Sequence, residues 1–279
     1  MQAPLPPGIA TRLRSGRHRQ GAARLAHPVD LGLAGRRLHR LRRQLHDRAT
    51  GANGLPFGVA RPLAGLVFSL GLILVIVGGA ELFTGDALMV MAFASRRITL
   101  AALLRAWAIV YVGNIVGALG TAALVFLAGQ HGFAKDGIGQ TALTVAAAKA
   151  VLPTVQLFFL AVLCNVLVCL TVWMSFAANS ATDKAMVIVP PIAAFVAAGF
   201  EHSIANLYFL PYGLAIEYWA APEFWTALGQ TGAAYSALTL GNALHDIAVA
   251  TIGNLVGGSL MVGVVYWFVY LRKRPAVDG

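Results

Sequence analysis

Long apolar runs separated by short polar segments fill the chain from residue 62 onward. Three of them, at residues 107–128, 155–177 and 247–271, are uninterrupted and long enough to cross a bilayer as helices, which takes about 20 residues. This pattern predicts an all-α polytopic membrane protein.

Two other apolar regions are interrupted near their middle. One break holds Glu81, and the other holds the adjacent pair Glu201 and His202. Ionisable residues at bilayer depth are costly and usually face a cavity or a transport pathway. The sequence therefore predicts two broken helices, whose apolar parts are residues 62–80 and 87–94 in the first, and 186–200 and 207–216 in the second.

An internal repeat follows each break. Residues 111–118 (YVGNIVGA) and 251–258 (TIGNLVGG) match almost position for position. Positive charge in the loops gives the two halves opposite orientations, because loops rich in Lys and Arg stay in the cytoplasm. Inverted repeats with paired broken helices place a transport site near the membrane midplane.

The formal net charge of +10 is confined to the N-terminal part of the chain. Residues 1–61 contain twelve Arg, no Lys and two Asp, whereas the remaining residues are neutral, with nine basic and nine acidic side chains. No aromatic interleaving accompanies the Arg cluster, so a nucleic-acid partner is not expected. The loop charges at Arg96, Lys184 and Arg272–Arg274 predict a cytoplasmic C-terminus; the family resemblance described below implies a bacterial inner membrane.

Residues 1–54 differ in character from the rest of the chain. Five crossings and a cytoplasmic C-terminus leave the N-terminus outside, where twelve Arg are unfavourable. A basic cytoplasmic tail, an Arg-rich transit segment and out-of-frame translation are the three interpretations. We expect a frameshift or sequencing error that replaces a first transmembrane helix, followed by a membrane domain at 55–274 and a cytoplasmic tail at 275–279.

Four stretches resemble the formate/nitrite transporter family. They are residues 79–85 (GAELFTG), 164–174 (CNVLVCLTVWM), 182–184 (TDK) and 199–206 (GFEHSIAN) with Pro211. The likeness covers about residues 55–274 and is nearest to the formate-channel branch, because residues 223–226 (EFWT) also recur there. It implies an aquaporin-like protomer of six helices, in a lipid-embedded homopentamer with one pore per protomer.

The resemblance also implies roles for individual residues. His202 is then the histidine at the pore centre, and Thr84 forms a hydrogen bond with it in one state. The remaining implied residues are the apolar constrictions Phe68, Leu72 and Phe195, the vestibular Lys149 and the polar lining residue Asn165. The chain departs from the family at Asp86, where Asn is common.

Each of these residues also has a structural interpretation. His202 can be a hydrogen-bonded structural histidine, although a His beside Glu201 in a broken helix favours function. For Glu81 and Glu201 we prefer the structural role of capping freed backbone N–H groups, at breaks that include Gly85 and Gly199. Lys149 fits an interfacial lysine as well as an anion-attracting one.

The expected function is a pore for small monovalent weak-acid anions, most of all formate, with proton coupling through His202. A nitrite or hydrosulfide pore is the alternative within the family. A non-transporting membrane protein, or the inactive product of a damaged gene, is the alternative from another class. No enzyme constellation, metal-ligand cluster or cofactor motif is recognisable.

Overall fold

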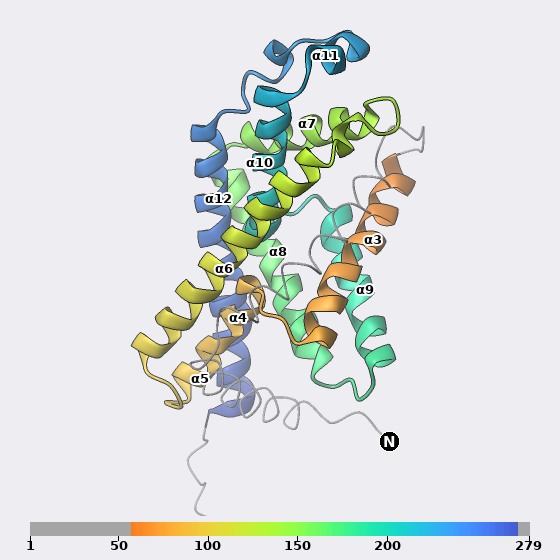
Figure 1. Cartoon of the computed structure of the whole chain (residues 1–279). Coiled ribbons are helices and arrows are strands. Elements are labelled where there is room, and N and C mark those ends of the chain that lie inside the picture. Colours follow the sequence, from red (N-terminus) through yellow and green to blue (C-terminus); the bar gives the residue numbers. More distant parts are fainter. Residues whose placement is uncertain (1–56, 273–279) are drawn as a thin grey trace, which may run out of the picture.

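The computed structural model describes residues 57–272, and every regular element in that range is helical (Figure 1). The all-α prediction is therefore confirmed for this part of the chain. The atypical segment 1–54, with the expected loss of a first helix, lies outside the described residues. So does the tail at 275–279.

The first half of the described chain contains one broken helix and one unbroken helix. α3 (Phe57–Gly78) stops at a short extended segment, after which the chain turns into helix again before a sharp turn at Ser95–Arg97. The elements that follow α3 are α4 (Phe83–Asp86), η1 (Ala87–Met89), α5 (Val90–Ala94) and the long helix α6 (Leu100–Leu127).

The second half repeats this plan with extra elements between the helices. An unbroken helix, α8 (Thr154–Ser175), precedes the broken pair α9 (Ala181–Ala197) and α10 (Ser203–Trp219), and α12 (Leu240–Leu255) follows. α12 continues in π-helical geometry to Leu271. The remaining elements are η2 (Gln130–Gly132), α7 (Gly137–Ala150), α11 (Pro222–Leu228), η3 (Gly232–Tyr235), η4 (Val256–Val264) and η5 (Trp267–Leu271).

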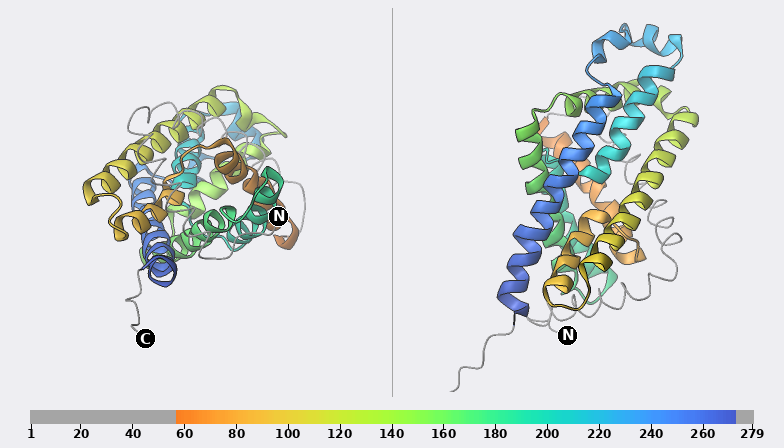
Figure 2. Two further views of the ribbon diagram at one scale, coloured as in Figure 1. Left: turned by 90° about the horizontal axis from the view of Figure 1, so that it is seen from below. Right: turned by 90° about the vertical axis from the view of Figure 1, so that its left-hand side faces the viewer.

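Four helices among the described residues are long and apolar enough to cross a membrane, at 58–78, 100–127, 154–175 and 232–271. α9 and α10 have 17 residues each and complete a further crossing only as a pair. Figure 2 shows α12 and its continuation running along the whole bundle, whereas α10 occupies one end of it.

The last helix begins earlier than the sequence pattern indicated. Apolar periodicity placed its start at residue 247, but α12 begins at Leu240, where Thr239 Oγ1 accepts a hydrogen bond from Asn242 N at 3.1 Å. The prediction was wrong because polar residues in the first turns were assigned to a loop. Asp246 therefore lies inside a helix of the bundle.

Close packing between the helices depends on small residues. α12 packs on α8, and a Cβ atom added at Gly253 would lie 2.6 Å from the carbonyl oxygen of Phe158. α3 packs on α9 in the same way, where a Cβ at Gly65 would lie 2.6 Å from Ala193 O. Small residues let helix backbones approach closely in membranes.

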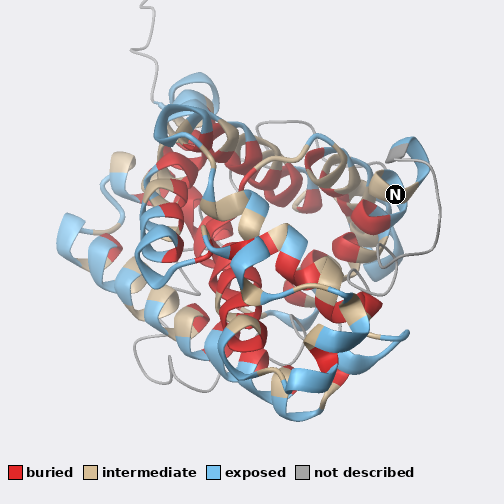
Figure 3. Cartoon of the chain, turned by 90° about the horizontal axis from the view of Figure 1, so that it is seen from above, coloured by how far each residue is buried: buried red, intermediate tan, exposed pale blue. Residues whose placement is uncertain are grey.

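The distribution of exposed side chains fits a membrane environment. Buried residues gather towards the middle of the bundle and exposed ones face outward (Figure 3). Many of the outward side chains are large and apolar, including Leu127 at 79% exposure and Val155 at 69%. Extended exposed apolar surfaces mark regions of a protein that meet lipid or another protein.

Candidate functional site

The two breaks end their first helices in the same way. Gly79 and Gly199 both have φ of +72°, a conformation that glycine adopts at little cost. The following N–H groups reach back five residues, from Ala80 N to Val75 O at 2.9 Å and from Phe200 N to Phe195 O at 3.1 Å. This is the Schellman ending of a helix, and it directs both chains into extended segments.

Two asparagines of the internal repeat hold the extended segments in place. Asn114 Oδ1 accepts from Phe83 N at 3.0 Å, and its Nδ2 donates to Glu81 O at 3.3 Å. Asn254 Oδ1 accepts from Ser203 N at 2.9 Å, and its Nδ2 donates to Glu201 O at 3.0 Å. Each amide thus binds backbone groups that a helix break leaves unpaired.

For Glu201 the structure differs from the expected capping role, which the asparagine takes instead. The Glu201 carboxylate accepts from Lys149 Nζ at 2.6 Å and from Asn206 Nδ2 at 2.8 Å, so its hydrogen bonds go to side chains. The capping roles of Asn114 and Asn254 were not predicted from the sequence. Their place in the repeated Gly-Asn pair after each break was the available signal.

The two repeats also meet directly. Tyr111 Oη and Thr251 Oγ1 occupy the same position in the two matching segments and lie 2.8 Å apart. Contact between equivalent residues is expected where two halves are related by a pseudo-two-fold axis. The inverted repeat is therefore visible in side-chain contacts as well as in the order of the helices.

His202 is the N-cap of α10 and contacts the other break. Its Nδ1 accepts a hydrogen bond from Ala205 N at 3.0 Å, and its Nε2 lies 3.0 Å from Thr84 Oγ1. Because Nδ1 accepts, the neutral ring carries its hydrogen on Nε2, which donates to Thr84. His202 is 2% exposed and Thr84 is fully buried.

Aromatic rings cover one side of this histidine. Phe195 stacks on the His202 ring at a centroid distance of 6.1 Å, and Phe68 meets Phe195 edge-on at 5.3 Å. Leu72 follows Phe68 one turn further along α3, and all three apolar side chains are buried. The expected constriction residues thus lie together beside the histidine.

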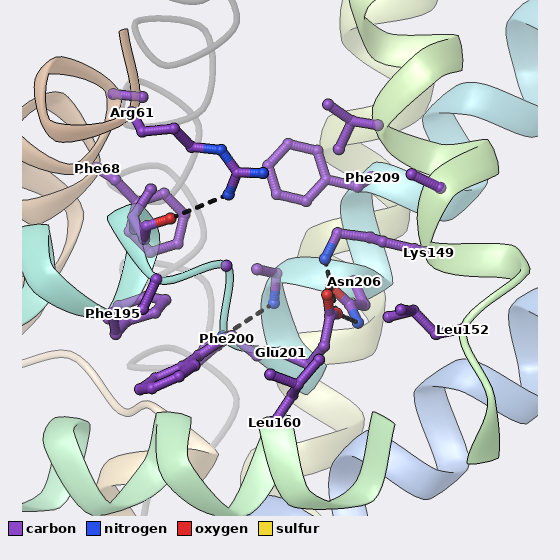
Figure 4. Close-up of a pocket in the computed structure, with 18 of the residues that line it drawn as sticks. Arg61, Phe68, Lys149, Leu152, Leu160, Phe195, Phe200, Glu201, Asn206 and Phe209 are labelled. Carbon is purple, nitrogen blue, oxygen red and sulfur yellow. Dashed lines mark hydrogen bonds and ion pairs between the residues drawn. The ribbon is translucent and has the colours of Figure 1, made fainter. Parts of the chain in front are cut away.

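Two cavities lie along α3 on either side of these residues. The larger has a volume of about 550 Å³, and its lining includes Phe68 and Phe195 (Figure 4). His202 also lines it. The smaller, of about 150 Å³, is lined by Leu72 and Glu81 among others. Of these two cavities, Phe68 lines the larger and Leu72 the smaller.

The larger cavity has a positively charged wall. Arg61 and Lys149 are its two cationic lining residues, against one acidic residue, Glu201. Figure 4 shows both cations directed into it, with Arg61 Nη1 donating to Val196 O at 3.3 Å. The Lys149 side chain is only 15% exposed and pairs with Glu201, so it is not a surface lysine. Sequence reasoning had not singled out Arg61.

The remaining residues expected at the site are Asn165, Gly199 and Gly85. Asn165 is fully buried and lines neither cavity, because its Nδ2 donates to Thr84 O at 3.2 Å and to Asn254 O at 2.6 Å. These two bonds hold the backbone at Thr84, beside the central pair, and at Asn254. Gly199 lines the larger cavity and Gly85 the smaller one. In residues 57–272 no group of His, Cys, Asp and Glu side chains is arranged to hold a metal ion.

Comparisons with known proteins agree with this architecture. The sequence model of the formate/nitrite transporter family matches residues 45–268. The chain is 46% identical over 226 residues to the formate channel FocA of Escherichia coli strain K12, covering 81% of this chain and 79% of that protein. It is 36% identical over 236 residues to a probable formate transporter of Methanothermobacter thermautotrophicus, covering 79% of each.

Solved structures agree as well. A pentameric formate channel with formate bound superposes with a TM-score of 0.82 at 37% identity, covering 90% of this chain and all of that one. An ion channel of the same family gives a TM-score of 0.78 at 26% identity, with 94% and 98% covered. With its paired helix breaks, central histidine and these similarities, the chain belongs to the formate/nitrite transporter family.

Proposed function

We propose that this protein is a pore for small monovalent anions of weak acids, with formate as its substrate. The observation that carries the proposal is the buried His202–Thr84 pair, set between a cavity with a cationic wall and a second cavity. Similarity to formate channels supports formate as the anion. The similar solved channel is pentameric, which supports a homopentamer of this chain in the bacterial inner membrane.

The charged wall and the apolar constriction act in opposite ways on an anion. Arg61 and Lys149 raise the local concentration of anions in the larger cavity. Phe68, Leu72 and Phe195 then impose a desolvation cost, because a bare charge in an apolar passage is highly unfavourable. Passage as the neutral acid removes that cost, and formate needs one proton to become neutral.

His202 provides the donor at this point of the path. In the neutral ring the Nε2 hydrogen can move from Thr84 Oγ1 to a substrate oxygen, so the ring offers a hydrogen bond. Donation of a whole proton requires an imidazolium, and Nδ1 can carry the second hydrogen only if its bond from Ala205 N is released. Proton coupling therefore involves a rearrangement at the N-terminus of α10.

Formate uptake into proteoliposomes tests the proposal. We expect His202→Phe to abolish uptake coupled to internal acidification, read with an entrapped pH dye. His245→Phe is the matched control, because His245 is exposed on α12 and bonds only Thr154 among the described contacts. Unchanged formate flux and pH response in His202→Phe would contradict the role of the histidine.

Two alternatives have distinct outcomes in the same system. A nitrite or hydrosulfide pore would transport those anions faster than formate in parallel uptake assays. A non-transporting or damaged product would show no flux of any of the three. It would also fail to give a pentamer when the purified protein is sized in detergent.

A further inference from the structure

One amide joins two carboxyl groups behind the larger cavity. Asn206 Nδ2 donates to Glu201 Oε2 at 2.8 Å and to Asp246 Oδ1 at 2.6 Å. Asn206 is fully buried and Asp246 is 1% exposed. Asp246 does not line the cavity, whereas Asn206, Glu201 and Lys149 do. Asp246 is thus linked to the cavity wall through a single buried side chain.

The charges in this cluster do not balance if both carboxyl groups are ionised. Lys149 Nζ, at 2.6 Å from Glu201 Oε2, is the ammonium group paired with the cluster. α8 and η4 also pack on α12 and carry no acidic or basic residue, and α7 carries only Lys149. α10 adds two buried tyrosines and, at its far end, Glu217. On α12 itself, His245 is exposed and bonds Thr154.

The oxygen contacts of Asp246 favour the protonated acid. Its Oδ1 has one donor, and its Oδ2 is buried with no hydrogen-bond partner within the described chain. A buried carboxylate that receives a single hydrogen bond and no counter-charge of its own is strongly destabilised and takes up a proton instead. One proton makes the cluster neutral, with Lys149 positive and Glu201 negative.

We propose that Asp246 is a buried proton-binding site that sets the charge of the larger cavity. With the proton bound, the cluster of Lys149, Glu201, Asn206 and Asp246 is neutral, and the cavity attracts anions. When the proton leaves to water through the cavity, the cluster gains one negative charge, which competes for the Lys149 ammonium and repels an anion. Alkaline conditions thereby weaken anion entry.

Infrared spectroscopy tests the proton site without any transport. A difference spectrum of the wild type minus Asp246→Asn at neutral pH should contain the carbonyl band of a protonated carboxylic acid. The wild type alone, compared between neutral and alkaline pH, should lose the same band, which keeps the test valid if the variant folds poorly. Absence of the band from both spectra would overturn the proposal.

The effect of Asp246 on anion entry rests on the proposed function, and it is measured separately as the pH dependence of formate uptake. The ratio of formate uptake at alkaline pH to that at neutral pH should be about tenfold or more higher in Asp246→Asn than in the wild type, because one unit charge several ångströms away acts at an effective dielectric constant of ~20. Glu223→Gln, at an exposed position of α11, should keep the wild-type ratio.

The experiments distinguish failure of the proposed function from failure of the role proposed for Asp246. A carboxylic acid band that depends on Asp246, in a protein that moves no formate, would contradict the proposed function and leave the proton site standing. Equal uptake ratios in the wild type and Asp246→Asn, in a protein that does move formate, would contradict the role of Asp246 in setting cavity charge.

Discussion

Thr84 Oγ1 lies 3.0 Å from His202 Nε2, and this contact joins the two helix breaks across 118 positions of sequence. His202 has no histidine counterpart in the first half, since Leu82 holds the matching position, whereas Glu201 is matched by Glu81. The paired glutamates and asparagines are therefore shared by both halves. The Thr84–His202 contact departs from the symmetry between the two halves, because the first half has no equivalent histidine.

Removing the Thr84 hydroxyl should impair transport more than folding. Thr84→Val keeps the shape of the side chain but leaves the buried His202 Nε2–H without its acceptor. The hydroxyl is lost at the point where the substrate meets the histidine, so formate uptake should fall by roughly ten- to a hundredfold, equivalent to about 1–3 kcal/mol in the barrier to passage. Thr171→Val, at another buried threonine that bonds only its own helix, should transport normally. Equal rates in the two variants would contradict a specific role for Thr84.

The capping asparagines should contribute strongly to stability. Asn254→Ala removes the side-chain partner of Ser203 N and Glu201 O and a further bond to the α8 carbonyl of Ala161, whereas Asn114→Ala removes the partner of two backbone groups. We expect losses of about 1–3 kcal/mol for each unsatisfied group, with Asn254→Ala the more destabilised variant. Thermal unfolding in detergent measures this. Asn242→Ala, at an exposed position, is the control and should unfold close to the wild type.

The Lys149–Glu201 pair should show strong coupling. Removing one partner leaves the other charge buried, which costs about 3–5 kcal/mol, whereas removing both relieves that penalty. Lys149→Met and Glu201→Gln should therefore each lower stability more than the double variant does. Additive losses in a double-mutant cycle would mean that the two side chains do not act as a pair.

Gly253 should not tolerate a side chain. Gly253→Ala forces α12 away from α8, because the new Cβ would lie 2.6 Å from Phe158 O and 2.7 Å from Ala161 Cβ. We expect a loss of about 1–3 kcal/mol and a lower melting temperature. Gly120→Ala is the matched control, since a Cβ there has no neighbour within 4 Å. A similar melting temperature for both variants would rule out close packing as the reason for Gly253.

Acidification should weaken the packing at one end of the bundle. His131 stacks on Phe126 at 5.0 Å and meets Phe224 edge-on at 5.6 Å. Burial lowers the pKa of His131 below its usual 6.5, while Asp136 acts in the opposite sense. The folded state thus favours the neutral ring, so its contribution to stability is complete above about pH 6.5 and declines as the pH falls further.

This pH effect is measured by comparing melting temperatures at neutral and mildly acidic pH. His131→Phe keeps an aromatic ring between Phe126 and Phe224 and cannot be protonated. Its melting temperature should therefore fall less than that of the wild type on acidification. An equal fall in both proteins would assign the acid sensitivity to other groups.

The residues of the family motifs were recognisable from the sequence alone, because each motif has a feature that is uncommon in a membrane helix. An ionisable pair inside an apolar run identified Glu201 and His202, and a repeated Gly-Asn sequence revealed the two halves. The roles of these groups could not be read in the same way. Asn254 caps a helix 51 positions away in sequence, and Lys149 reaches Glu201 across 52 positions. These partners lie on different helices, so they are decided by how the helices pack against one another.

Asp246 illustrates the same limit. Its polar neighbours in sequence, Asn242 and His245, suggested a loop, but the bundle places Asp246 against Asn206 of α10 in the protein interior. Asp246 lies on the buried face of α12 with Ala243 and Ala250, and tertiary packing decides that this face meets Asn206.

The membrane-spanning class, the two breaks, the inverted repeat and the family are readable from the order of residues, because hydrophobic length and glycine at a helix end are local properties. Only the tertiary structure decided that asparagines cap the breaks, that Glu201 pairs with Lys149, and that Asp246 joins them through Asn206. A buried polar group requires a hydrogen-bond partner, and the packing of the helices decides which partner lies within reach.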